Sequence, residues 1–367
     1  MLIAPDRECK VEARARDRAA WPELRALWSE LAAPRSIFLS AEWIGTWLEI
    51  FGESLRPRLV TFEAAGEPVG VCMITKARPN AAYRIVRRLS INGCGEPTGD
   101  TVYSERNDLV CRAGWELPVA ASLAHFLEAE DWEEVSLDGF IPGIAYEALK
   151  RAFPDGAEEM KRNSFVDLEE IRASGSTYEA RLTPGARKHV QRSLRYQSES
   201  GELRVSAARD LSGALRMFDE LGALSRKRWH EEGKTSVFAS PAFVAFHRAF
   251  IAKMFSRGGV LLLRVTAGEA LAGVVYALVE HGRVCLYQAG YFYTGDKRLS
   301  PGTATLAAVV RYCLDHGFRE CDFLSGDAQY KESLGTKTRT MAWAVFRRDG
   351  IKAWCFEQLK QAKRRFL

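Results

Sequence analysis

The sequence lacks the residue patterns that mark metal centres, disulfide scaffolds and membrane spans. Its eight cysteines include no Cys-x-x-Cys pair and its six histidines no His-x-x-x-His pair, which argues against a zinc or redox site. No apolar run approaches the roughly 18–20 residues that cross a bilayer, and the charged first twenty residues contain no apolar signal core. We therefore expect reduced, buried cysteines, no bound metal and a cytoplasmic protein.

The excess of charge of one sign is also small. The 52 Lys and Arg residues exceed the 47 Asp and Glu residues by five, too few to indicate a nucleic-acid partner on charge alone. A mildly basic balance fits an anionic partner such as CoA, a nucleotide or an acidic lipid surface. Hydrophobic residues make up 47% of the 367 residues, with 19 Phe and 9 Trp, which excludes a disordered chain. This length predicts two globular domains.

The first part of the chain alternates helical and strand-like segments. Helices are expected over 17–33 and 41–51, because apolar residues recur there at three- and four-residue spacing. Two strand-like runs then meet in a hairpin at Ala65-Gly66. Further strands are expected near 84–91, 108–112, 133–140 and 164–168, and further helices near 115–129 and 142–153. The pattern predicts a mixed α/β fold.

The second half repeats this plan. Two helices, 210–232 and 240–255, precede a three-stranded meander, and its first hairpin (262–278) matches 59–74 in reading strand, Ala-Gly-Glu, strand. The shared order predicts two tandem domains, each a mixed, mostly antiparallel sheet flanked by helices. We place the N-terminal domain at 1–160, a connector with a basic helix at 161–205, and the C-terminal domain with a final amphipathic helix at 206–367.

The most informative stretch is 283–335. A strand leads there through a loop ending in Ser300-Pro301-Gly302-Thr303 into an amphipathic helix, and a second strand follows. Unpaired backbone N–H groups and the positive end of the helix dipole at such a start bind phosphate. The second strand ends in a polar cluster that includes Asp327, Tyr330 and Lys331. A phosphate site beside titratable groups predicts a phosphorylated cofactor with chemistry next to it.

With these features the chain resembles the GNAT N-acyltransferase superfamily, in particular its CelD/BcsL-like branch, which is related to the FemABX-type tandem-GNAT enzymes. The resemblance covers residues 175–345 well and the first half only by its plan. It is carried by Arg228-Trp229, Gly233, Ser236, Phe238, Ser300-Pro301-Gly302, Asp322-Phe323-Leu324, Gly326 and Tyr330-Lys331. The helix-opening loop departs from the family pattern, because Arg298–Ala304 keeps one glycine of the usual pair. The loop therefore matches the family's CoA-binding pattern only in part.

The resemblance implies two tandem GNAT-like domains, the first of them degenerate, and an acyl-CoA bound by the second without a metal. The CoA would lie in a gap between two parallel strands, 283–292 and 319–325. Its pantetheine amides would pair with Gln288, Ala289 and Gly290. Its pyrophosphate would meet the backbone of Ser300, Pro301, Gly302, Thr303 and Ala304, where every residue except the proline has an N–H group to donate. Lys331 would also contact the cofactor.

The same resemblance names catalytic candidates, and each keeps a structural alternative. Tyr330 is the expected general acid, or it only packs the short helix. Asp327 accepts a proton or caps that helix. Asp322, a charge within a strand, is functional or paired with a buried partner. His230 acts as a base, or is a partly exposed structural histidine.

The substrate pocket is assigned to Trp229, Ser236 and Phe238, with a place in the core as the alternative for the two aromatic residues. Lys331 alternatively lies solvated on the surface. The basic helix, with Arg187, Lys188, Arg192 and Arg195, approaches CoA phosphates or forms a solvated face. The amphipathic stretch 351–367 either contacts the inner face of the membrane or docks on the body.

The expected function is acyl transfer from a CoA thioester to a primary amine. The acceptor would be an amino sugar of an envelope polysaccharide precursor, an amino acid, or a long-chain sphingoid-type lipid amine, with no nucleic-acid partner. A second reading is FemABX-like aminoacyl transfer from charged tRNA. A third is a non-catalytic binding module of the same fold. The oligomeric state and the acyl chain length stay open.

Overall fold

The structure is a computed structural model that describes residues 10–33, 35–77, 86–97, 99–153, 155–293, 300–326 and 328–348. The chain divides into two compact units. Unit 1 comprises Met1–Met160 together with Met341–Leu367, and unit 2 comprises Lys161–Thr340. This division places the predicted connector in unit 2 and the last residues of the chain with unit 1.

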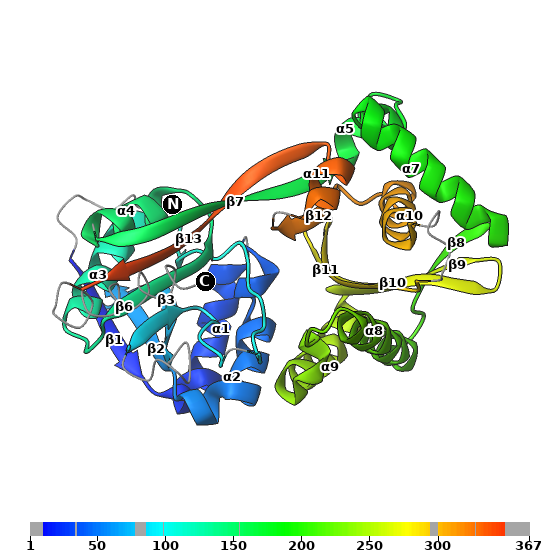
Figure 1. Cartoon of the computed structure of the whole chain (residues 1–367). Helices are drawn as coiled ribbons and strands as arrows, with labels where there is room; N and C mark the ends of the chain where they lie inside the picture. Colours follow the sequence, from blue (N-terminus) through cyan, green and yellow to red (C-terminus); the bar gives the residue numbers. More distant parts are fainter. Residues whose placement is uncertain are drawn as a thin grey trace, which may run out of the picture. The chain divides into compact units, whose positions relative to one another are not determined.

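Unit 1 is a twisted sheet with helices on its faces (Figure 1). Its strands run in the order β1-β2-β3-β4-β6-β13, and β5 pairs with β3. The elements in chain order are β1 (Val11–Arg16), α1 (Trp21–Ala32), α2 (Ala41–Leu55), β2 (Arg58–Ala64), β3 (Glu67–Ala77), β4 (Arg88–Ile91), β5 (Val110–Cys111), α3 (Glu116–Glu128), β6 (Glu134–Phe140) and α4 (Ile144–Ala152). Short 3₁₀ turns at Arg18–Ala20 and Ile37–Leu39 precede α1 and α2.

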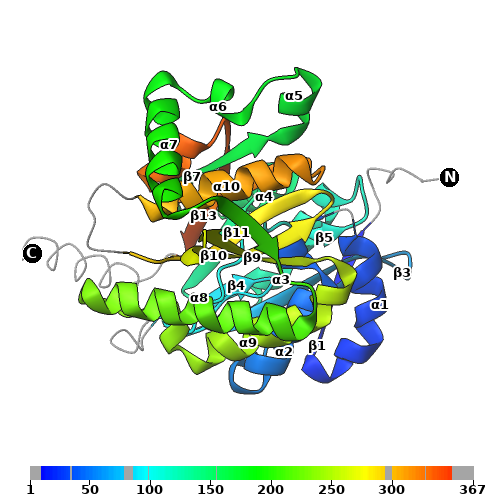
Figure 2. The same cartoon turned by 90° about the vertical axis from the view of Figure 1, so that its right-hand side faces the viewer.

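Unit 2 has a sheet in the order β7-β12-β11-β10-β9-β8. Figures 1 and 2 show α7 and α10 on one face of this sheet and α8 and α9 on the other. The elements are β7 (Gly156–Asp167), α5 (Leu168–Ala173), α6 (Tyr178–Arg181), α7 (Pro184–Gln197), β8 (Leu203–Ala207), α8 (Leu211–Glu231), α9 (Pro241–Met254), β9 (Val260–Ala267), β10 (Ala270–Glu280), β11 (Arg283–Tyr291), α10 (Pro301–Asp315), β12 (Glu320–Ser325) and α11 (Gln329–Leu334). The last strand, β13 (Lys337–Arg347), follows α11 and belongs to the sheet of unit 1.

The same order of elements occurs twice, which confirms the predicted duplication. Each copy begins with a strand and two helices, continues through three strands, a helix and a strand, and ends with a helix and a strand; the first copy has the two-residue strand β5 in addition. The final strands are exchanged between the units. β7 follows α4 but pairs with β12 of unit 2, and β13 follows α11 but pairs with β6 of unit 1. Each repeat therefore supplies the strand that completes the sheet of the other.

Local sequence explains most element boundaries. The side chains of Ser40, Asp210 and Ser240 accept hydrogen bonds from backbone N–H groups in the first turns of α2, α8 and α9. The predicted hairpin turn has left-handed backbone at both central residues, with φ of 50° at Ala65 and 84° at Gly66, as a tight two-residue turn requires. These caps and turns fix where the apolar faces begin, so that the faces meet the sheet.

Two expectations differ from the structure. The strand predicted near 164–168 is the end of a longer strand, β7, which starts at Gly156, and β13 was not predicted. Both strands are exposed along part of their length, so their alternation of apolar and polar residues is weak. The amphipathic stretch 351–367 lies outside the described residues.

The expected state of the cysteines is confirmed where the structure describes them. Cys72, Cys94, Cys111, Cys285, Cys313 and Cys321 are buried free thiols. Across the described ranges, no helix combines the length and apolar character needed to cross a bilayer.

Candidate functional site

The candidate site is a gap between β11 and β12. These strands are parallel, as predicted, and their pairing covers Arg283 to Cys285 on β11 and Glu320 to Asp322 on β12. A bulge follows on β11, because Ala277 of β10 pairs with Leu286 whereas Tyr276 pairs with Gln288, leaving Tyr287 as the extra residue. A bulge bends its strand and increases its twist. β11 therefore turns away from β12 and leaves the backbone edges of both strands to face a gap.

Gln288, Ala289 and Gly290, the residues expected to line this edge, lie on β11 beyond the bulge. They pair with β10, and the pairing of β11 with β12 ends before them at Cys285. A Cβ atom on Gly290 would lie 2.9 Å from Leu221 Cδ1 and 3.0 Å from Leu224 Cβ, both on α8. Glycine is therefore needed here for close packing of α8 against the strand.

The phosphate cradle was predicted at the start of α10. Ser300 makes no side-chain cap, Pro301 occupies the first turn without an N–H, and Ala304 N donates to Ser300 O at 3.0 Å. The first donors at this helix terminus are thus the amides of Gly302 and Thr303. The ring of Tyr291 covers Gly302, since a Cβ added there would lie 3.1 Å from Tyr291 Cε2.

A basic helix lies beside this helix terminus. Thr303 Oγ1 is 3.3 Å from His189 Nε2 of α7, and His189 Nδ1 is 3.2 Å from Arg192 Nη2. Arg187 is used differently, since its guanidinium donates to the carbonyls of Glu179 and Ala180 at 2.8 and 2.7 Å. His189 was missed from the sequence, although it lies in the first turns of a helix already singled out as basic.

Three tyrosines surround the mouth of the gap. The rings of Tyr291 and Tyr293 are 6.3 Å apart, and electrostatic interactions link the hydroxyls of both to Tyr330 on α11. Burial raises the pKa of each hydroxyl above its ordinary value, and for Tyr293 the guanidinium of Arg228, 4.5 Å from its ring, opposes that rise. All three hydroxyls therefore keep their protons at neutral pH and are able to donate them.

Sequence reasoning selected Tyr330 and missed the other two tyrosines. Their spacing was the available signal, because residues two apart on a strand share a face of the sheet. Tyr330 as a whole residue is 43% exposed, which leaves it accessible to a ligand. Its role as general acid stays a prediction.

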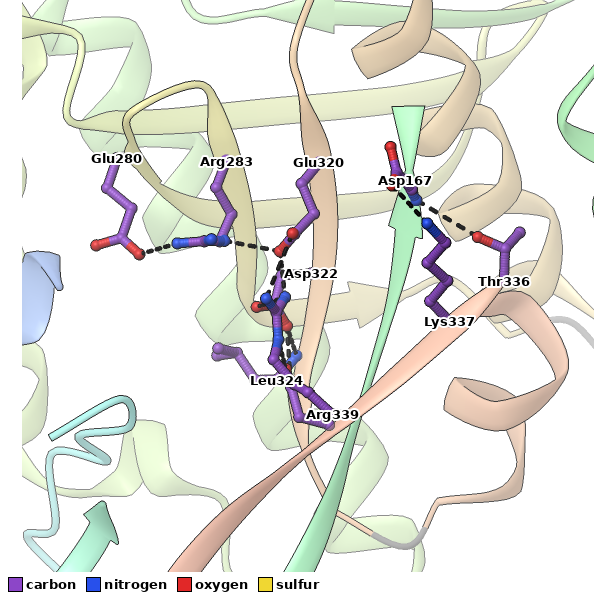
Figure 3. Close-up of polar contacts among 10 residues, drawn as sticks. Asp167, Glu280, Arg283, Glu320, Asp322, Leu324, Thr336, Lys337 and Arg339 are labelled. Atoms are coloured by element: carbon purple, nitrogen blue, oxygen red, sulfur yellow. Dashed lines mark hydrogen bonds and ion pairs between the residues drawn. The ribbon is translucent and has the colours of Figure 1, made fainter. Parts of the chain in front are cut away.

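Asp322 is fully buried and bound by three donors (Figure 3). Its Oδ1 accepts from Asn163 Nδ2 at 2.7 Å and from Leu324 N at 2.8 Å, and its Oδ2 accepts from Arg339 Nη2 at 2.9 Å. These contacts supply the buried partner that the structural alternative required. A direct part in the reaction has no support from this geometry.

The ion pair continues along the strands as alternating charges (Figure 3). The guanidinium of Arg339 also donates to Glu320, Arg283 Nε donates to the same carboxylate at 2.7 Å, and Arg283 Nη1 donates to Glu280 at 2.8 Å. Burial opposes the charge of Arg283, but the carboxylates of Glu320 and Glu280 outweigh it and raise its pKa. Arg339 was not a sequence candidate, because β13 itself was not predicted.

The network holds an unusual backbone at the end of β12. Leu324 has a φ of 58°, a left-handed conformation that leucine rarely adopts. Its N–H donates to Asp322, and Lys331 Nζ donates to its carbonyl at 3.3 Å and to Ser325 O at 2.5 Å. Lys331 thus binds the strand end, and the structure offers no support for its expected contact with the cofactor. Asp327, on the same turn, lies outside the described residues.

The remaining candidates fall into two groups. His230 and Trp229 lie exposed at the end of α8, and Lys234 Nζ is 5.3 Å from the ring of Trp229. Ser236 and Phe238 are buried: Ser236 Oγ is 2.8 Å from Ser225 Oγ, and Phe238 packs on aromatic rings of the core. The assignment of these two buried residues to a substrate pocket has no support from this geometry.

Comparisons with known proteins identify the class of this fold. The structure is similar to the crystal structure of FemX, with a TM-score of 0.54 at 12% identity over 90% of this chain and 96% of that chain. It is similar to L-PGS from Bacillus licheniformis (TM-score 0.53, 11% identity, 90% and 94% coverage). It also matches the C-terminal domain of a putative lysylphosphatidylglycerol synthetase from Agrobacterium fabrum (0.53, 11%, 91% and 93%). At such low identity these likenesses show a shared fold.

The family follows from a match within the sequence. Residues 184–332 match the family described as an acetyltransferase (GNAT) domain, and this range contains β11, α10, β12 and Tyr330. The segment that carries the site therefore matches a GNAT domain, and this match supports an acyltransferase. No curated protein is similar enough in sequence to count as a relative.

Proposed function

We propose that unit 2 transfers an acyl group from a CoA thioester to a primary amine. The observation that carries the proposal is the parallel strand pair whose pairing ends at Cys285 and Asp322, with the first turn of α10 in the same unit. A pantetheine arm needs backbone partners along an open strand edge, which Gln288–Gly290 offer. A pyrophosphate needs N–H donors and positive potential, which Gly302, Thr303 and the helix dipole offer.

The proposed reaction is direct attack. The amine nitrogen forms a bond to the thioester carbon, and the carbonyl oxygen gains negative charge, which N–H groups on the gap edge of β11 stabilise. The carbon–sulfur bond then breaks, and the Tyr330 hydroxyl gives its proton to the departing thiolate. The nitrogen loses its extra proton to water. Burial of the Tyr330 hydroxyl raises its pKa, so the group is protonated when the thiolate leaves.

The exposed cations near α10 support an anionic donor. Lys188, Arg192 and Arg195 are exposed on α7, the helix whose His189 contacts Thr303. Such a surface suits the phosphates of CoA. We place the reaction in the cytoplasm, with an amino sugar, an amino acid or a long-chain amine as acceptor.

The test compares two substitutions at one position. In both Gly302→Ala and Gly302→Asp the new Cβ displaces the Tyr291 ring, but only aspartate adds a negative charge at the phosphate position. Measured by isothermal titration calorimetry, the alanine variant should bind CoA a few-fold more weakly, and the aspartate variant at least about tenfold more weakly than alanine. Equal affinities in the two variants would remove α10 from the donor site.

A second measurement tests the donor itself and the acid. In a thermal-shift assay with acetyl-CoA, palmitoyl-CoA and aminoacyl-tRNA, a thioester should raise the melting temperature. A rise with aminoacyl-tRNA alone would mean that the donor is the tRNA and not CoA. The likeness to FemX motivates that comparison. In Tyr330→Phe we expect kcat to fall while CoA affinity holds, since the ring remains and only the proton donor is lost. Wild-type kcat in this variant would exclude Tyr330 as the acid.

A further inference from the structure

Unit 1 contains the counterpart of the strand pair that forms the candidate site in unit 2. β4 and β6 are parallel and pair over three positions, from Arg88 with Glu134 to Ser90 with Ser136. The first position holds an ion pair in both units: Arg88 Nη2 is 2.5 Å from Glu134 Oε2, and Arg283 Nε is 2.7 Å from Glu320 Oε1. The duplicated fold therefore produces the same parting of strands twice.

In unit 1 the chain itself occupies part of the gap. Asn107 N donates to Gly139 O at 2.8 Å, and Asn107 Nδ2 donates to Ile91 O at 3.1 Å and more weakly to Asp138 O at 3.4 Å. The side chain of Asn107 thus bridges β4 and β6. It uses the backbone groups that a pantetheine arm would need, so unit 1 does not offer a second site for CoA.

A cavity of about 310 Å³ remains beside this bridge. It lies between the two strands and the loop that joins β4 to β5. This volume is at the lower end of the range for small-molecule pockets, about 300–1,000 Å³. Its lining is polar and aromatic: Arg88, Ser90, Cys94, Gly95, Glu96, Thr101, Val102, Tyr103, Ser104, Glu105, Asp138 and Trp343.

The walls of the cavity are held in place from behind. Two buried tryptophans of α2 donate into the loop: Trp47 Nε1 to Glu96 Oε1 at 2.5 Å, and Trp43 Nε1 to Ser104 Oγ at 3.1 Å. Gly139 permits close approach on the other side, because its φ is 63° and a Cβ there would lie 2.9 Å from Ser104 O. The polar groups are therefore fixed before any ligand arrives, which lowers the entropic cost of binding.

The charges of the lining select the ligand. Glu96, Glu105 and Asp138 contribute carboxyl groups, of which Asp138 also accepts from Ser136 Oγ at 2.9 Å. Among the lining residues the guanidinium is that of Arg88, which is paired with Glu134. Burial raises the pKa of Glu96 to about 8, so at neutral pH this group is a carboxylic acid that donates as well as accepts. A phosphate or carboxylate ligand would meet acceptors and negative charge, whereas an ammonium group would meet carboxylates.

The uncharged lining adds two further requirements. The hydroxyls of Ser90 and Thr101 offer hydrogen bonds to ligand hydroxyls, and the indole of Trp343 offers a flat apolar face. An aromatic face beside carboxyl groups also favours a cation.

We propose that the cavity of unit 1 is a binding site for a small hydroxylated amine of about monosaccharide size. The site does not depend on the acyl transfer proposed for unit 2. If that reaction is correct, such an amine is also of the class that it consumes.

The test is calorimetric titration of the full chain, without CoA, with glucosamine, glucose and glucuronate. Glucosamine should bind at one site. Glucose should bind about tenfold more weakly, because it lacks the ammonium group, and glucuronate should show no measurable binding. Glu105→Gln and Thr101→Val should each weaken glucosamine binding, the first by about tenfold and the second by a few-fold. Glu128→Gln, which makes the same charge change at an exposed site, should bind as wild type.

Two results would overturn the proposal: no binding of glucosamine at millimolar concentrations, or equal affinity in Glu105→Gln, Thr101→Val and wild type. Thr101→Val keeps the test valid if the first variant fails to fold. Gly302→Asp in unit 2 should bind glucosamine normally. Failure of the CoA experiment and failure of this one are thereby distinguished.

Discussion

Replacement of Glu96 by glutamine should make unit 1 more stable at alkaline pH. Glu96 is 9% exposed, and burial raises its pKa from the ordinary 4.5 to about 8, with the negative charge of Asp138 adding to the rise. Hydrogen bonds from Trp47 and from backbone N–H groups act against burial. Glutamine keeps an acceptor for Trp47 and cannot ionise, so it mimics the protonated acid at every pH.

The sign follows from proton binding in the two states. Between pH 4.5 and about 8 the folded protein holds the Glu96 proton and the unfolded chain has lost it, so the free energy of unfolding falls as pH rises through this window. Each pH unit costs 1.36 kcal/mol, so the full window amounts to roughly 3–5 kcal/mol. Above about pH 8 no further loss from this group is expected. The groups around Glu96 are Asp138, Cys94, Arg88, Tyr103 and Glu105.

Tryptophan fluorescence isolates the relevant unit. Eight of the nine tryptophans fall within the residues of unit 1, and the ninth is Trp229 in unit 2. Urea unfolding followed by fluorescence at pH 5.5 and 8.5 should show a lower midpoint for wild type at the higher pH. With m of about 1–3 kcal/mol/M, a loss of about 3 kcal/mol corresponds to 1 M urea or more. The same pH dependence in wild type and Glu96→Gln would refute the reasoning.

Two further substitutions test the core and the ion network of unit 2, by urea unfolding followed by far-UV circular dichroism. Phe238→Ala should lower the free energy of unfolding by about 3–5 kcal/mol, because the ring is buried among other aromatic rings; a loss under 1 kcal/mol would mean that the site is open. Arg339→Met should cost about 3–5 kcal/mol by leaving Asp322 buried without its cation. Lys337→Met, at an exposed pair on the same strand, should cost far less, and equal losses in the two variants would contradict the network.

The sequence by itself determined most of the elements and predicted a place for the donor site. Periodicity and capping residues located α1 to α4 and α7 to α10 but not the short α5 and α6, and Ala65-Gly66 located a hairpin turn, because both signals are set by neighbours a few residues apart. The loop before Pro301 indicated a phosphate site for the same local reason. The duplication was also visible, since the order of elements repeats along the chain.

Only the tertiary structure decided the contacts between distant segments. The exchange of β7 and β13 depends on which sheet edge completes each unit, and strand pairing carries no local code. Asp322 was a catalytic candidate in the sequence. Its carboxylate binds Asn163 and Arg339, which are far from it in the sequence, and Asp322 thereby holds the end of β12. The cavity of unit 1 likewise gathers Glu96, Asp138 and Trp343 from separate elements. Charge placement of this kind follows from packing, because burial and pairing are properties of the folded surroundings of a residue rather than of its neighbours in the chain.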